Sequence, residues 1–143
     1  MSAESILTIG GRSQMDNPTV ILLVEDEAVV REVTRDVLKH AGYRVLESGS
    51  PREALDVVSR YPGHIDLLLT DVVMPEMNGA DLAHRLQLIQ PGLITVFMSG
   101  YAEGDIAQRI SRRSVIHIQK PFTVDGLLSR ITEALQGGLR SAS

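Results

Sequence analysis

The chain has 143 residues, 43% of them hydrophobic, so it is the size of one domain and can bury a core without cross-links. It contains no cysteine, which excludes disulfides, thiolate metal sites and a cysteine nucleophile. A net charge of −4 and an aromatic content of 3% argue against nucleic-acid binding, which needs basic patches or stacking rings. No apolar run approaches the roughly 20 residues of a membrane span, and no secretion signal opens the chain, so we expect a cytoplasmic location.

Composition divides the chain into three parts. Residues 1–18 show no sustained periodicity and include Gly10-Gly11 and Pro18, which predicts a flexible leader. Residues 137–143 are mostly small and polar, which predicts a flexible tail. Residues 19–136 are expected to form one folded domain.

Within that domain, short apolar runs alternate with segments of helical spacing. In chain order, the expected strands are Val20–Val24, Tyr43–Leu46, Ile65–Leu69, Leu93–Met98 and Val115–Ile118. Each strand is followed by an expected helix, and these are Val29–Leu38, Ala54–Val58, Leu82–Ile89, Ile106–Ile110, which has a thin apolar stripe, and Val124–Leu135. Gly42 ends the first helix, while Ser50-Pro51, a position near Asn78 and the N-cap Thr123 begin the second, third and fifth. Apolar runs without polar alternation indicate strands covered on both faces. The alternation predicts an α/β doubly wound fold with a parallel sheet.

Polar residues follow four of these strands directly. Glu25 and Asp26 follow the first strand, Asp71 the third, Ser99 the fourth and Lys120 the fifth. The carboxyl ends of parallel strands share one edge of the sheet, so these groups are expected to meet in one crevice. Clustered carboxylates repel one another and recruit a cation, and an all-oxygen site near phosphate suits Mg²⁺.

Four motifs then resemble the receiver domain of response regulators. They are ILLVEDE at 21–27, LLLTDVVMPEMNG at 67–79, VFMSGYA at 96–102 and IQKPF at 118–122, and the resemblance covers residues 19–136. It implies a flavodoxin-like, five-stranded parallel sheet in the order 2-1-3-4-5 with helices on both faces. The stretch MSGYA resembles receivers attached to hybrid histidine kinases.

The resemblance implies a phosphoacceptor module of a two-component phosphorelay. Asp71 would accept a phosphoryl group from a phosphohistidine of a sensor histidine kinase or a histidine phosphotransfer protein. Asp26, Asp71 and the backbone carbonyl of Val73 would bind Mg²⁺, with Glu25 holding the ion through water. Lys120, before a cis peptide bond to Pro121, would stabilise the phosphoryl oxygens, and Ser99 would hydrogen-bond the bound group. Such a domain is a signalling module that assists its own phosphorylation and dephosphorylation, not an enzyme.

Phosphorylation is expected to switch the surface of the fourth helix, at Glu103–Arg113, the fifth strand and the fifth helix, which is also the expected homodimer face. His117 departs from the family pattern, which has an aromatic switch residue at this position. A histidine there indicates a weaker or pH-sensitive switch.

Two other functions use similar residues. A Mg²⁺-dependent phosphohydrolase with an aspartyl-phosphate intermediate needs a second aspartate where Val73 stands. A flavodoxin-like nucleotide or flavin binder needs a glycine-rich loop after the first strand, where this chain is acidic. A receiver fold used only as an interaction surface would not need the acidic residues that follow the strands.

The positions two residues beyond Asp71 and Ser99 are Val73 and Tyr101, and neither carries a carboxylate or amide that orients an attacking water. We therefore expect slow self-dephosphorylation. Val73→Asn should accelerate the decay of the phosphoprotein at fixed Mg²⁺. The loss of radiolabel from the phosphoprotein measures this decay. Equal decay rates for the variant and the wild type would contradict this interpretation.

Overall fold

The computed structural model describes residues 18–100 and 116–142. Its elements are β1 (Val20–Val24), α2 (Ala28–His40), β2 (Arg44–Ser48), α3 (Pro51–Arg60), β3 (Leu67–Asp71), α4 (Gly79–Ile89), β4 (Ile94–Ser99), β5 (Ile116–Gln119) and α6 (Val124–Ala142). Strands and helices alternate as predicted. The expected fourth helix and, apart from Pro18, the expected leader lie outside the described residues.

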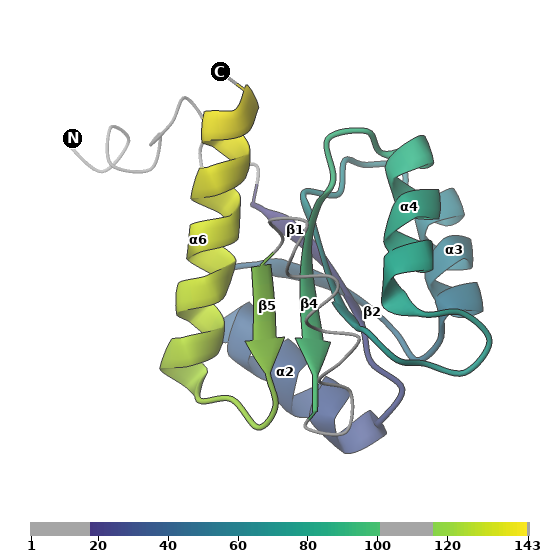
Figure 1. Cartoon of the computed structure of the whole chain (residues 1–143). Helices are drawn as coiled ribbons and strands as arrows, with labels where there is room; N and C mark the ends of the chain where they lie inside the picture. The colour runs from purple at the N-terminus through teal and green to yellow at the C-terminus, as the bar shows by residue number, and fades with distance from the viewer. Residues whose placement is uncertain (1–17, 101–115, 143) are drawn as a thin grey trace.

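The five strands form one parallel sheet in the order β2-β1-β3-β4-β5, which confirms the predicted fold (Figure 1). β3 ends later than the apolar pattern indicated. Its pairing continues past the apolar run, with Thr70 opposite Val24 and Asp71 opposite Met98. Hydropathy misses this extension because the last two residues of the strand are polar although they are buried.

Helices cover both faces of the sheet, so successive strand residues enter two different cores. Leu22 and Val24 pack with residues of α3 and α4, whereas Ile21 and Leu23 pack with residues of α2 and α6. In Figure 1, α6 and the pair α3 and α4 accordingly flank the strands from opposite sides. Burial on both faces explains the unbroken apolar runs, and it surrounds the strand ends with a low-dielectric interior.

Side chains cap three of the helices where the sequence predicted helix starts. The side-chain oxygens of Ser50, Asn78 and Thr123 accept backbone N–H groups at 3.1, 2.8 and 2.9 Å. Each cap satisfies a donor that the first helical turn leaves free. Gly42 follows the end of α2 with φ of 101°, a conformation that glycine adopts without steric cost.

Helix α6 extends to Ala142, through residues that their composition predicted to be a flexible tail. Extension of an existing helix avoids the cost of nucleation, so a glycine there costs only about 1 kcal/mol. The limits of the folded domain itself stay a prediction. Across the described residues, no helix combines the length and hydropathy that a membrane span requires.

Gly79 fixes the distance between α4 and the end of β3. Its N–H donates to the carbonyl of Val72 at 2.7 Å, and a Cβ at this position would lie 2.2 Å from the carbonyl oxygen of Asp71. A side chain therefore cannot fit without displacing the backbone that carries Asp71.

Gly79→Ala should lower the free energy of unfolding by about 1–3 kcal/mol, the usual cost of overpacking. Urea unfolding followed by circular dichroism measures this change. Gly92→Ala is the matched control, because a Cβ at Gly92 meets no atom within 4 Å. Equal stability of the two variants would contradict the steric role of Gly79.

Candidate phosphoryl-acceptor site

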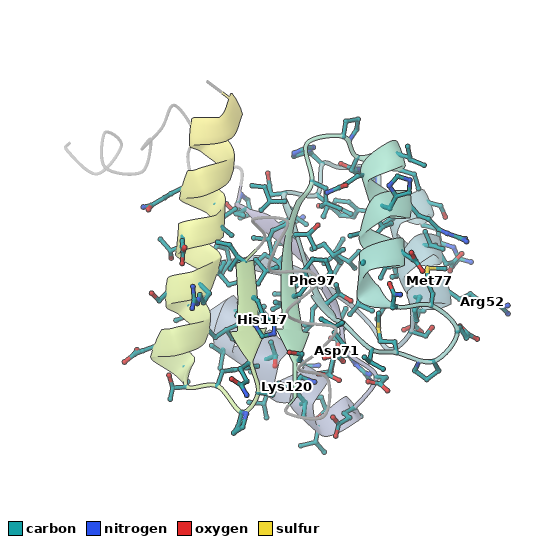
Figure 2. All side chains as sticks on the ribbon, in the orientation of Figure 1. Arg52, Asp71, Met77, Phe97, His117 and Lys120 are labelled. Atoms are coloured by element: carbon teal, nitrogen blue, oxygen red, sulfur yellow. The ribbon has the colours of Figure 1, made fainter. Side chains whose placement is uncertain are left out.

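Four strands bring polar side chains to one edge of the sheet. Glu25 follows β1, Asp71 and Ser99 are the last residues of β3 and β4, and Lys120 follows β5. The N–H of Lys120 donates to the carbonyl of Ser99 at 2.8 Å, so the ends of β4 and β5 stay in register. Figure 2 shows Asp71 and Lys120 close together near these strand ends. The predicted convergence is therefore present in the structure.

Three carboxylates meet at this edge. Ligand oxygens of Glu25, Asp26 and Asp71 all lie within 4.8 Å of one another. Glu25 and Asp71 are buried, with 0% and 3% of their surface exposed, whereas Asp26 is exposed. The cluster thus opens to solvent on the side of Asp26.

The ammonium of Lys120 lies between the two buried carboxylates. Its Nζ is 2.6 Å from Glu25 Oε1 and 2.6 Å from Asp71 Oδ1. The second oxygen of Glu25 accepts the N–H of Glu27 at 3.1 Å. Asp71 Oδ2 is buried without a hydrogen-bond partner among residues 18–100 and 116–142. One oxygen of Asp71 is therefore available to a further group.

Comparison with known proteins supports a receiver domain. Residues 21–132 match the response regulator receiver domain family. The chain belongs to this family. It is 34% identical to the sensor kinase CckA of Brucella abortus (strain 2308) over 125 residues, 87% of this chain but 13% of CckA. It is also 34% identical to the response regulator receiver protein CpdR of the same strain, over 80% of this chain and 95% of CpdR.

A solved structure of the receiver domain from the hybrid histidine kinase CckA has the same fold. It superposes with a TM-score of 0.69 at 32% identity, over 82% of this chain and 99% of that one. The chain is thus a receiver domain of two-component systems, a family of phosphorelay signalling modules. The resemblance noted from the four motifs is confirmed.

The receiver's acidic pair holds one proton between two carboxyl groups. Burial and, to a smaller extent, the neighbouring Glu25 raise the pKa of Asp71 and Lys120 opposes the rise, so that the pKa is about 8. Burial also acts to raise the pKa of Glu25, but its interactions with Asp71 and Lys120 outweigh burial, so the pKa is lowered. Burial disfavours the charged amine of Lys120, yet the two carboxylates raise its pKa. These directions favour the protonated form of Asp71 and the ionised form of Glu25.

These residues fit a hard divalent cation. The donors are all oxygens, Asp71 Oδ2 has no partner among the described residues, and Asp26 lies on the open side. Receiver domains bind Mg²⁺ in such an acidic pocket. Both oxygens of Glu25 already accept hydrogen bonds from protein donors.

Two further contacts connect to the site. Ser99 and His117, predicted separately, form a hydrogen bond between Oγ and Nε2. Arg31, which the sequence analysis missed, donates from Nη1 to the carbonyl of Glu25 at 2.8 Å and ion-pairs with Glu47. In the sequence, Arg31 is marked only by its position one turn into the helix that follows the acidic residues Glu25-Asp26-Glu27. Arg31 thereby ties α2 and β2 to the acidic loop.

Val73 lies two residues beyond Asp71, and 40% of this residue is exposed.

The raised pKa of Asp71 has a consequence for stability. Between the ordinary pKa of 3.8 and about 8, the folded state holds a proton that the unfolded state has lost. The free energy of unfolding therefore falls as the pH rises through this window. Asp71→Asn removes that dependence, so without divalent cations it should gain stability over the wild type as the pH rises.

Relative to Asp71→Asn, the free energy of unfolding of the wild type should fall by a few kcal/mol between the two ends of this pH window, because one pKa unit corresponds to about 1.4 kcal/mol. Urea unfolding at both pH values measures this change. Asp56→Asn, which neutralises a carboxylate 51% exposed on α3, is the control and should not change the pH profile in this way. Parallel profiles for wild type and Asp71→Asn would contradict the burial effect.

Proposed function

We propose that Asp71 accepts a phosphoryl group from a phosphohistidine of a sensor histidine kinase or a histidine phosphotransfer protein. The observation that carries this proposal is the arrangement around Asp71, whose two oxygens differ. Oδ1 forms an ion pair with Lys120 at 2.6 Å, whereas Oδ2 lies outside that ion pair, and neither oxygen has a hydrogen bond among the described residues. A carboxylate fixed on one side and available on the other is a suitable nucleophile.

In this reaction Oδ2 of ionised Asp71 forms a bond to phosphorus as the phosphorus–nitrogen bond of the donor breaks. The electron pair of that bond goes to the imidazole nitrogen of the donor, which then takes a proton from solvent. Lys120 offers its ammonium to the phosphoryl oxygens, and Ser99 offers its hydroxyl. Such charge stabilisation provides most of the catalysis in phosphoryl transfer.

For this chain we assign a Mg²⁺ site to Asp26, Asp71 and the backbone carbonyl of Val73, with Glu25 acting through water. When bound, Mg²⁺ supplies positive charge that favours ionised Asp71 and neutralises phosphoryl oxygens. The pairing of both Glu25 oxygens with protein donors supports its indirect role.

The donor protein must reach Asp71, and an apolar groove beside Lys120 supports one approach. The groove has a volume of about 520 Å³ and is lined by residues of α2 and of the loop after β5, among them Val29, Val33 and Phe122. Val29 and Val33 are 75% and 57% exposed. A donor domain that presents its phosphohistidine to Asp71 would cover these side chains, which is consistent with their exposure.

We also propose that this receiver is a signalling module that works in the cytoplasm without direct nucleic-acid contact. The homodimer face stays a prediction, because its helix lies outside the described residues. A phosphohydrolase is disfavoured by Val73, which provides no acid for a leaving group.

The decisive experiment incubates the protein with acetyl phosphate and Mg²⁺ and measures intact mass. The wild type should gain one phosphoryl group, Asp71→Ala should gain none, and chelation of Mg²⁺ should reduce uptake. Equal uptake by Asp71→Ala would refute the assignment, and continuous turnover of a small phosphate ester would favour the hydrolase.

Comparison of a small-molecule phosphoryl donor with a protein donor distinguishes effects on the phosphorylation reaction from effects on docking of the donor protein. Val33→Asp should match the wild type with acetyl phosphate but lose transfer from a phosphorylated histidine phosphotransfer protein. Leu88→Asp is the control, because Leu88 is also exposed, at 73%, but lies on α4. Equal effects of both variants on protein-mediated transfer would argue against the groove.

A further inference from the structure

The carboxylate of Asp26 is placed by its backbone rather than by contacts of its side chain. The residue is exposed, and across residues 18–100 and 116–142 the structure gives its carboxylate no hydrogen bond or ion pair. One of its oxygens nevertheless lies within 4.8 Å of ligand oxygens of Glu25 and Asp71. The position of Asp26 therefore depends on the peptide unit that joins it to Glu25.

Hydrogen bonds hold the backbone of Glu25 from two sides. Its N–H donates to the carbonyl of Ser48 at 3.1 Å, and its carbonyl accepts Nη1 of Arg31 at 2.8 Å. That carbonyl belongs to the same planar peptide unit as the N–H of Asp26. A donor that fixes the carbonyl therefore fixes the orientation of the unit from which Asp26 continues.

The loop that carries Asp26 enters α2 without a capping side chain. Glu27 is the N-cap of α2 and its side chain makes no capping hydrogen bond, whereas side chains cap three other helices. The N–H of Arg31 donates to the carbonyl of Glu27 at 2.9 Å, so Arg31 lies in the first turn of the helix. Its side chain reaches back to the loop and provides a contact that a cap would otherwise supply.

The end of β2 and the residue after it determine where the guanidinium of Arg31 lies. Its Nε is 3.5 Å from Oε1 of Glu47, and the two side chains are 22% and 34% exposed. A Cβ at Gly49 would lie 2.9 Å from Nη1, the nitrogen that donates to Glu25. The absence of a side chain at Gly49 thus leaves room for this hydrogen bond.

We propose that Arg31 is a positioning residue for divalent-cation binding, which acts on Asp26 through the carbonyl of Glu25. Without this hydrogen bond the peptide unit can rotate, and Asp26 must be ordered when the cation binds. Ordering costs conformational entropy, so the affinity for the cation falls. The proposal rests on the Mg²⁺ site proposed for Asp26 and Asp71.

The positive charge of Arg31 alone has the opposite effect on the cation. A guanidinium near the acidic cluster repels a second cation, so its removal strengthens Mg²⁺ binding if charge is all that matters. Loss of positioning weakens the binding instead. The sign of the change in affinity therefore distinguishes the two roles.

The first test measures Mg²⁺ affinity by isothermal titration calorimetry. Arg31→Met should bind Mg²⁺ roughly tenfold more weakly than wild type, as expected for loss of a contact that orients a metal ligand. Arg35→Met is the matched control, because Arg35 lies one turn further along α2 and pairs with Glu47 at 3.1 Å and with Asp36 at 3.0 Å. This control should keep the affinity of the wild type. Unchanged or tighter binding by Arg31→Met, or an equal loss in Arg35→Met, would refute the positioning role.

The second test displaces the guanidinium and keeps its charge. Gly49→Ala should also weaken Mg²⁺ binding, because the new Cβ occupies the space next to Nη1 of Arg31. In an Arg31→Met background Gly49→Ala should cause no further loss, whereas independent effects would add. Urea unfolding without divalent cations measures stability separately. A purely structural role of Arg31 would lower the stability of Arg31→Met and leave the Mg²⁺ affinity of the folded protein unchanged.

Asp26→Asn separates failure of this inference from failure of the metal site. If the wild type binds Mg²⁺ and Asp26→Asn weakens binding while Arg31→Met does not, the positioning role is refuted and the site stands. If the wild type binds no Mg²⁺, or Asp26→Asn binds it equally well, both the assigned site and the role of Arg31 fail.

Discussion

The site depends on one ammonium placed between two buried carboxylates. Lys120 and Glu25 are 95 residues apart in the chain, yet their charged atoms lie 2.6 Å apart, and Asp71 is equally close to Lys120. Two carboxylates in a low-dielectric interior repel each other strongly, so the pair is stable only with a cation or a shared proton. The folded receiver uses both, because Lys120 stays charged and Asp71 holds a proton.

That arrangement ties the chemistry to the architecture of the sheet. The strands are buried on both faces, which lowers the dielectric around their ends and raises the pKa of Asp71. Backbone contacts then limit movement: Gly79 packs against the carbonyl of Asp71, and Arg31 binds the carbonyl of Glu25. A rigid edge of this kind can hold opposed charges at short distance, as phosphoryl transfer requires.

The contact between Ser99 and His117 extends this edge toward the surface. It connects the last residue of β4, beside the acceptor, with the middle of β5. Where the family pattern has an aromatic side chain, this chain has His117, which forms a hydrogen bond with Ser99.

The order of the elements, the parallel sheet and the polar residues at its edge can all be predicted from the amino-acid sequence. Those features are local: apolar runs mark strands buried on both faces, and Ser50, Asn78 and Thr123 mark helix starts. The contacts between individual atoms could not be predicted in this way. Pairing of Lys120 with both acids, the bond of Arg31 to Glu25 and the contact of Ser99 with His117 depend on strand register and side-chain rotamers, which a one-dimensional pattern does not contain. The pKa of Asp71 likewise follows from burial, which arises only when the chain has folded.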